Sequence, residues 1–221
     1  MPLCLCAFAP YFAMTSHEDN IKDNPTQPVR IIACGVFRPV LEQLNLEKRF
    51  PGLNVAYLPS NLHINPHELK HNLLKEIMAS QKRNERIICL YGECFQDIDI
   101  LCKQYGVMKM EGHHCYEIFL GRDKFRGIMD ESAKTYFLEN DLIHNFEEYC
   151  VKPLELHDKE MKELFFKNYE RLVYVRQPSD SDLIPAVNNI ADFLGLSIIV
   201  RDADYSNFEK ALIDLISADS K

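Results

Sequence analysis

The chain has 221 residues, of which 47% are hydrophobic, and its 33 acidic against 25 basic residues give a formal net charge of −8. This acidic balance argues against a nucleic-acid-binding protein, which needs a basic surface to contact phosphates. No apolar run approaches the roughly 18 residues that a membrane-spanning helix needs, so we expect no contact with a membrane.

Residues 1–29 are expected to form a flexible N-terminal arm ahead of an ordered domain over residues 30–221. Residues 15–29 are polar, contain two prolines and show no hydrophobic periodicity. Residues 1–14 are apolar but lack the basic start and the cleavage site of an export signal, and Met14 is an alternative start of translation. We therefore expect a cytoplasmic protein, in which the eight cysteines indicate metal binding or catalysis more than disulfides.

The ordered part alternates short apolar runs with segments of helical periodicity. Seven runs predict buried strands, at residues 31–36, 54–58, 86–91, 107–110, 134–138, 171–176 and 197–201. Helices are expected at residues 39–50, from 66 through an apolar stripe to 78, and at 96–105, 116–129, 141–150, 158–168, 182–194 and 207–216. This alternation predicts βαβ units, and therefore a Rossmann-like α/β fold with a mostly parallel sheet. A division into two lobes, residues 30–150 and 151–221, is the alternative.

Two of these helices have clear end signals. Asn65 is suited to cap a helix, Pro66 to occupy its first turn, and Glu68 to complete the cap from three residues further on. Gly195 follows the helix at 182–194, where a left-handed residue commonly ends a helix. Local chemistry therefore supports the helical assignments at both places.

Three cysteines stand at the ends of predicted strands. Cys34 ends the first strand, and Cys94 and Cys115 lie in the polar turns after the third and fourth. Because the carboxyl ends of strands in an open α/β sheet line one edge, these thiols are expected to converge. Thiolates select zinc, copper(I) or iron–sulfur clusters, so we predict a zinc or iron–sulfur site. The chain contains no C-x-x-C motif, so the prediction depends on topology and not on spacing.

Histidines supply the remaining candidate ligands. His63 follows the second strand, at the equivalent edge position, and His113 and His114 directly precede Cys115. We take His63 or His114 as the imidazole ligand, with His113 as the alternative. His67 and His71 have the spacing of a two-histidine clip on a helix, but without a third ligand they are expected to face solvent.

Two functions without a metal remain open. In the first, Cys94 or Cys115 is the nucleophile of a hydrolase or transferase, with a histidine as base and Glu93 or Asp97 orienting it. Glu93 argues mildly against this mechanism, since a neighbouring carboxylate raises the pKa of a thiol. In the second, the chain is a non-catalytic binding module. Dinucleotide binding is excluded because no G-x-G-x-x-G or P-loop motif follows any strand. Arg38, near the start of a predicted helix, could still bind an anion of another kind.

A series of motifs resembles a known family. These are Cys34-Gly35, Leu58-Pro59 with Leu62-His63, Tyr91-x-x-Cys94, Gly112-His113-His114-Cys115-Tyr116 with Phe119 and Gly121, Thr135 to Leu138, and Asn168 to Tyr174. Together they are similar to domain-of-unknown-function family 1638, over about residues 30–205. The chain departs from that pattern after Cys94, where relatives commonly have glycines and this chain has Phe95-Gln96-Asp97. This difference argues against a phosphate-binding site made of backbone N–H groups in that turn.

The resemblance implies a site and a metabolic setting. Genes of this family often neighbour those of corrinoid-dependent methyltransferases, which implies a role close to methyl transfer and a corrinoid protein or methyltransferase as partner. Cys34, Cys94 and Cys115 fall on the family's cysteine positions and His63 on its histidine position. We also expect Tyr91 and Glu93, beside Cys94, and Arg38 to contact a cofactor.

Overall fold

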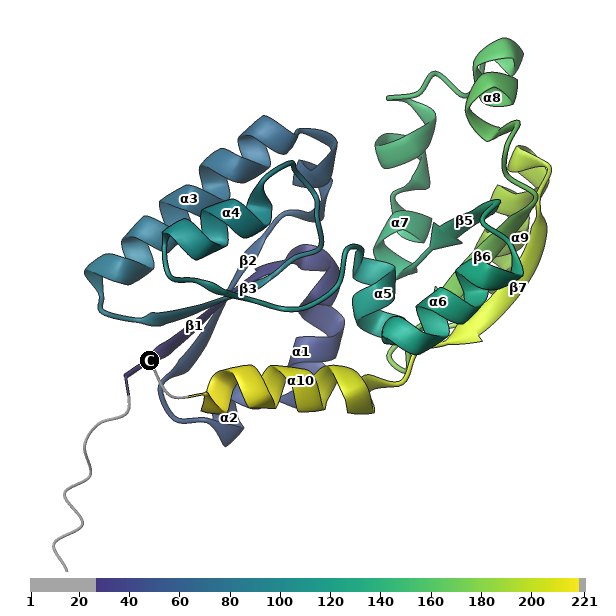
Figure 1. The fold of residues 1–221 in the computed structure, drawn as a ribbon. Helices are drawn as coiled ribbons and strands as arrows, with labels where there is room; N and C mark the ends of the chain where they lie inside the picture. Colours follow the sequence, from purple (N-terminus) through teal and green to yellow (C-terminus); the bar gives the residue numbers. More distant parts are fainter. Residues whose placement is uncertain (1–26, 219–221) are drawn as a thin grey trace, which may run out of the picture.

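The computed structural model describes residues 27–218, so the predicted N-terminal arm up to residue 26 and the alternative start at Met14 lie outside the described residues. In the described part the chain forms two parallel sheets with helices around them (Figure 1). No helix in this part is both long enough and apolar enough to cross a bilayer. The expected α/β architecture of βαβ units is confirmed.

The first sheet contains the strands β1 to β4 in the order β2-β1-β3-β4, all parallel. In Figure 1, α3 and α4 lie above this sheet and α1 and α10 lie below it. Its elements are β1 (Val29–Cys34), η1 (Gly35–Phe37), α1 (Arg38–Leu44), α2 (Leu46–Arg49), β2 (Leu53–Leu58), η2 (Ser60–Ile64), α3 (Pro66–Lys82), β3 (Arg86–Leu90), α4 (Ile98–Gln104) and β4 (Met108–Lys109).

The second sheet has the order β5-β6-β7, again parallel. Two helices lead into it from the first sheet, and the chain returns from it into α10. These remaining elements are α5 (Cys115–Leu120), α6 (Arg122–Glu131), β5 (Thr135–Leu138), α7 (Asn140–His144), the π-helical turn η3 (Glu147–Val151), α8 (Lys159–Phe166), β6 (Arg171–Arg176), α9 (Ile184–Leu194), β7 (Ser197–Asp202) and α10 (Tyr205–Ser217).

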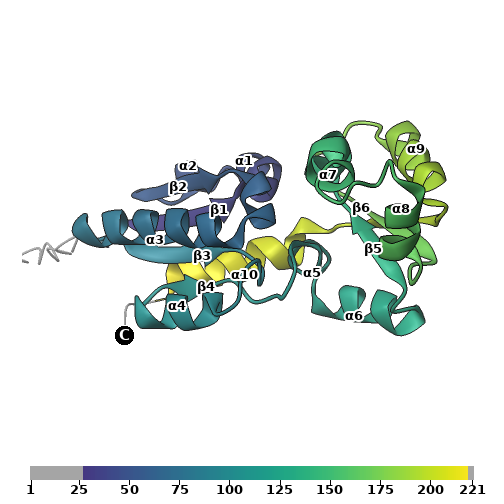
Figure 2. The same ribbon diagram turned by 90° about the horizontal axis from the view of Figure 1, so that it is seen from above.

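The two sheets define two lobes that lie side by side (Figure 2). The chain passes from one sheet to the other between Lys109 and Thr135, which is upstream of residue 150, where the sequence suggested a division. The last helix then crosses back, because Phe208, Leu212 and Ile216 of α10 belong to the core cluster that contains the buried residues of the first sheet and extends to β5 and β6 of the second. The first lobe is therefore built from both ends of the described chain.

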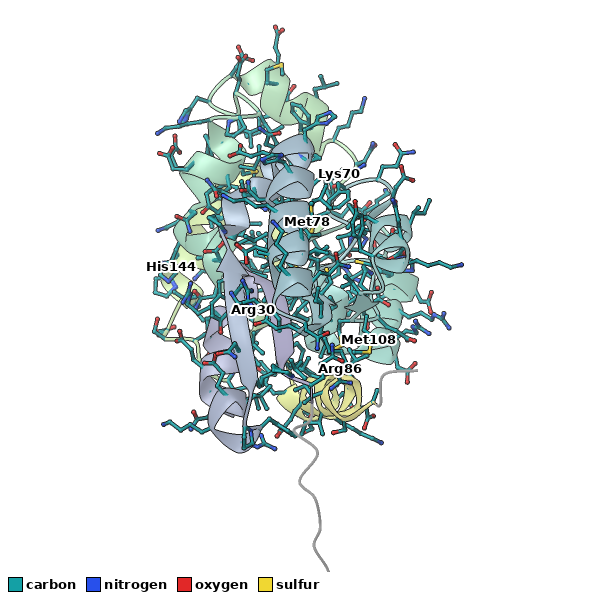
Figure 3. The ribbon with its side chains drawn as sticks, turned by 90° about the vertical axis from the view of Figure 1, so that its left-hand side faces the viewer. Arg30, Lys70, Met78, Arg86, Met108 and His144 are labelled. Carbon is teal, nitrogen blue, oxygen red and sulfur yellow. The ribbon has the colours of Figure 1, made fainter. Side chains whose placement is uncertain are left out.

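Polar contacts fix α10 against the first sheet. Arg86, at the start of β3, donates hydrogen bonds to the backbone carbonyls of Leu215, Ile216 and Ala218, and it lies beside α10 in Figure 3. On α2, Arg49 pairs with Glu209 at 2.5 Å. Arg86 thus holds the C-terminal end of α10 beside the amino end of β3, whereas Phe208, near the start of the helix, stacks on Phe37 just after β1, so α10 runs along the sheet.

Local signals account for several helix ends. The Asn65 side chain accepts a hydrogen bond from the Glu68 N–H at 3.2 Å, and Gly195 ends α9 with φ +72°, both as predicted. The single helix expected over residues 116–129 is wrong, since Gly121, with φ +80°, divides it into α5 and α6. The apolar stripe of α3 is narrower than expected, because Met78 is exposed (Figure 3).

Candidate functional site

A cavity of about 250 Å³ lies where the carboxyl ends of the strands of both sheets meet. The first lobe contributes the turns after β1, β2, β3 and β4, and the second contributes the turn after β5 with part of α7 and η3. Its walls contain three cysteines, three histidines, three carboxylates and four aromatic rings. They are Cys34, Cys94, Cys115, His63, His113, His114, Glu93, Glu139, Asp141, Phe37, Tyr91, Tyr116 and Tyr149, with Val36, Ser60, Gly92 and Leu142.

The three cysteines at strand ends are brought together at this cavity. Cys34 is the last residue of β1 and is 8% exposed, while Cys94, in the turn after β3, and Cys115, the first residue of α5, are half-buried. The thiols lie close enough for each to disfavour ionisation of another: an ionised Cys94 would raise the pKa of Cys34, and an ionised Cys34 or Cys94 would raise the pKa of Cys115. By contrast, Cys89, Cys102 and Cys150 are buried in the cores, as the sequence predicted.

Burial determines the protonation of these thiols. Removal from water raises the pKa of Cys34 to about 12, and it also raises the pKa values of Cys94 and Cys115. A cysteine nucleophile needs the opposite, a pKa lowered by a nearby cation or helix start. The metal-free site therefore holds neutral thiols, which is unfavourable for the hydrolase or transferase mechanism.

Two histidines have their ring orientation fixed by hydrogen bonds. Nδ1 of His63 donates to the carbonyl of Ser60 at 2.7 Å, and Nδ1 of His113 lies 2.8 Å from Oε1 of Glu93. Such bonds hold the proton on Nδ1 and leave the Nε2 lone pair available, which is the usual arrangement of a metal-binding histidine. His114 instead packs near the Phe125 ring. His67 and His71 are exposed on α3, as expected.

The side chains surround the cavity and do not meet at one point. Among residues 27–218 no three His, Cys, Asp or Glu side chains lie close enough to bind a single metal ion together. Arg38 is also displaced from the thiols: its guanidinium lies 4.0 Å from the centre of the Tyr57 ring and pairs with Glu42, beside a neighbouring cavity. Tyr91 and Glu93, the other two expected cofactor contacts, do line the cavity with the cysteines.

Tight packing holds the turns of Cys94 and Cys115 against each other. The backbone N–H of Glu93 donates to the carbonyl of His113 at 2.7 Å. A Cβ atom on Gly92 would lie only 2.6 Å from that same carbonyl oxygen. Only glycine leaves room for this approach, so the sequence Tyr91-Gly92-Glu93-Cys94 sets the distance between the two cysteine turns.

Glu139 is a cavity residue that the sequence reasoning missed. It follows β5, is 4% exposed, and accepts hydrogen bonds at 2.8 Å from the backbone N–H groups of Asp141 and Leu142. Burial raises its pKa to about 8, against the lowering effect of those two bonds. Cys34 was predicted to line the site because it stands at the carboxyl end of a strand. The same rule, applied to the strand at residues 134–138, would have identified Glu139.

The raised pKa of Glu139 predicts a pH-dependent stability. A carboxyl that binds its proton more tightly in the folded state contributes stability below about pH 4.5, and this contribution is lost as the pH rises towards about 8. Relative to Glu139→Gln, the native protein should lose up to about 1.4 kcal/mol per pH unit over that range. Urea unfolding of both proteins at several pH values measures this difference. A constant difference across the range would show that the carboxyl is ionised as easily in the folded chain as in the unfolded one.

A buried hydroxyl in the cavity wall has no partner within the described residues. Tyr91 is 1% exposed, and its hydroxyl makes no hydrogen bond. Burial raises the pKa of this hydroxyl, and ionisation of the nearby Cys34, Cys89 or Cys94 would raise it further. An unpaired buried hydroxyl is costly, and a bound group beside the thiols would satisfy it.

Comparison with known proteins gives one match. A sequence profile described as "Protein of unknown function (DUF1638)" matches residues 57–212. That segment contains His63, Cys94, Cys115 and Glu139, whereas Cys34 precedes it. No curated protein and no solved structure matches the chain.

Proposed function

Since the chain belongs to the DUF1638 family of proteins of unknown function, we propose its function from the cavity itself: the protein binds a zinc ion or an iron–sulfur cluster through Cys34, Cys94 and Cys115, with a histidine as the fourth ligand. The observation that carries this proposal is the convergence of three cysteines, from the end of β1, the turn after β3 and the start of α5, on one cavity. Buried cysteines that serve only packing have no reason to gather at a strand-end cavity beside histidines.

The donor set fits such a group chemically. Three thiolates with one imidazole are soft ligands of the kind that bind zinc and iron–sulfur clusters. A bound metal also removes the difficulty of the raised thiol pKa values, because a coordinating thiol is deprotonated outright. His63 and His113 both hold their Nε2 lone pairs free for coordination, and the family resemblance implies that His63 stands at a histidine position of the family.

The spread of the thiols favours a cluster over a single ion. A single ion needs all its ligands at about 2.0–2.3 Å, and the described side chains do not meet that closely. In a four-iron cluster each thiolate would bind a different iron, so the sulfur atoms would lie farther apart. The unpaired Tyr91 hydroxyl would then donate to a sulfur atom at the cavity wall.

The residues of this chain would tune the bound group. A cluster supplies one-electron transfer, and a zinc ion supplies activation of a bound thiol. Tyr91 would donate a hydrogen bond to the centre, Glu93 would orient the His113 ring, and the apolar walls would limit access of water. A place in the reducing cytoplasm would keep the thiols competent for binding.

A role in one-carbon metabolism is a further part of this proposal. It stands on the family resemblance, which implies a corrinoid protein or a corrinoid-dependent methyltransferase as partner. A corrinoid would then belong to that partner and not to the cavity described here.

The experiment is purification without oxygen, followed by analysis of iron, acid-labile sulfide and zinc. We expect either iron and sulfide in the ratio of a cluster, with the absorption of a brown protein, or about one equivalent of zinc. A colourless protein that contains none of these, and that takes up none on incubation with iron and sulfide or with zinc, would overturn the proposal.

A further inference from the structure

A second cavity adjoins the one that the three cysteines line, which we call the thiol cavity. The second cavity has a volume of about 370 Å³, and its walls come from the turns after β1 and β2 and from the start of α7. The two cavities meet at Val36, Ser60 and Asp141, which line both. We call the second one the Arg38 cavity, after the arginine in its wall.

The strand order places both cavities where a ligand is expected. In the order β2-β1-β3-β4, the chain passes from β1 to β2 on one side and then to β3 on the other. Open α/β sheets bind ligands outside the carboxyl ends of the strands at such a reversal. The thiol cavity contains Cys34 from β1 and Cys94 from the turn after β3, so it spans the reversal, and the Arg38 cavity continues it over β1 and β2.

Arg38 is the only lysine or arginine among the described residues that line either cavity. Its guanidinium lies over the Tyr57 ring, 4.0 Å from the ring centre, and this stacking fixes the plane of the group. The ion pair with Glu42 is 3.7 Å long, beyond hydrogen-bonding distance, and both side chains are more than half exposed. Such a pair contributes little, so the fork of donors on Arg38 remains available to an anion.

Close packing fixes the wall around Arg38. A Cβ atom on Gly35 would lie 3.3 Å from both the carbonyl oxygen of Leu58 and the backbone nitrogen of Ser60, so the turns after β1 and β2 are in contact. Pro39 stands in the first turn of α1, directly after Arg38. Because these elements are held in place before binding, a ligand loses little affinity to the ordering of the protein.

One carboxylate stands opposite Arg38. Asp141, in α7 of the second lobe, lines both cavities, and its Oδ1 accepts a hydrogen bond from Nδ2 of Asn145 at 3.2 Å. Arg38 belongs to the first lobe. An anion in the Arg38 cavity would therefore bind on the first-lobe side, and repulsion from Asp141 would limit its affinity.

We propose that the Arg38 cavity binds the carboxylate or phosphate group of a small acidic ligand, and that the rest of this ligand extends into the thiol cavity. The guanidinium fork matches the two oxygens that either group presents. The second part of this inference rests on the proposed function, because it brings the ligand to the thiol-bound group. The substrate of the site is then an organic acid or a phosphate ester.

NMR titration of the full chain with acetate and with inorganic phosphate tests the anion subsite. We expect at least one of these anions to shift the backbone amide signals of Gly35 and Ser60 saturably, and acetamide, an uncharged molecule of the size of acetate, to shift neither. Arg38→Gln should weaken binding on the order of tenfold, and Asp141→Asn should strengthen it. Arg126→Gln, which removes an exposed arginine of α6 that lines neither cavity, should leave binding unchanged.

The two anions also identify the acidic group. Saturation with acetate alone would indicate a carboxylate, and saturation with phosphate alone would indicate a phosphate. The absence of a saturable shift with both anions, or equal affinity in native protein and Arg38→Gln, would overturn the inference.

Straight-chain mercaptoalkanoic acids test the second part on metal-loaded protein, since their thiol can bind the metal while their carboxylate reaches Arg38. The acid of suitable length should bind more tightly than the alkanethiol of the same length, and Arg38→Gln should remove this difference. Equal binding at every length would show that the ligand does not extend between the cavities.

Metal content is measured on the same samples, which separates this inference from the proposed function. Anion binding by a protein that takes up no metal would support the subsite and count against the proposed function. A metal-loaded protein that binds neither acetate nor phosphate would overturn the subsite alone.

Discussion

Replacement of Cys94 by serine is expected to reduce bound iron or zinc to less than about a tenth of the native content. Serine keeps the size of the side chain, so the turn after β3 should fold normally, but a hydroxyl is a poor ligand for soft metals. Cys34→Ser and Cys115→Ser should have the same effect, since each removes one of the three cysteine side chains that line the cavity. Elemental analysis after purification without oxygen measures the loss.

Cys102→Ser and Cys150→Ser are the matched controls for this series. Both cysteines are buried, in α4 and in η3, but neither lines the cavity. These variants should lose some stability and keep their metal. Equal metal content in Cys94→Ser and Cys102→Ser would remove Cys94 from the ligand set.

Gly92→Ala is expected to destabilise the fold by about 1–3 kcal/mol and to lower metal retention as well. The new methyl group would lie 2.6 Å from the carbonyl oxygen of His113, a backbone atom that cannot rotate away. Relief of the clash must push the turn of Cys94 away from the turn of Cys115. Urea unfolding and metal analysis of the same preparation measure the two effects.

Gly127→Ala provides the control for that change. Gly127 lies in α6, and a Cβ atom there would meet no atom within 4 Å. Alanine favours a helix over glycine by about 1 kcal/mol, so this variant should be slightly more stable and should bind metal normally. A Gly92→Ala protein that behaves like Gly127→Ala would show that the two cysteine turns are not held by this contact.

The sequence was sufficient to predict the strands and the gathering of the cysteines. Apolar runs bounded by polar turns are a local signal, and all seven predicted strands are present. The rule that parallel strands share one carboxyl edge then placed Cys34, Cys94 and Cys115 together without any diagnostic spacing. That prediction therefore depended on the expected strand topology and not on a sequence motif.

Other features depend on contacts that no local pattern records. The division into two sheets arises because β5 pairs with β6 and with no strand of the first lobe, and strand order is not visible in periodicity. Arg38 comes shortly after β1, as the cavity residues Val36 and Phe37 do, but its guanidinium lies over the Tyr57 ring of the adjacent strand and not in the cavity. Glu139 reaches the cavity only because the second lobe faces the first.

Native mass spectrometry of the intact chain, purified and sprayed without oxygen, tests the central claim most directly. We expect the native protein to carry the added mass of one iron–sulfur cluster or one zinc ion, and the triple variant of Cys34, Cys94 and Cys115 to serine to have the mass of the chain alone. The same added mass on both proteins, or on neither, would contradict the account.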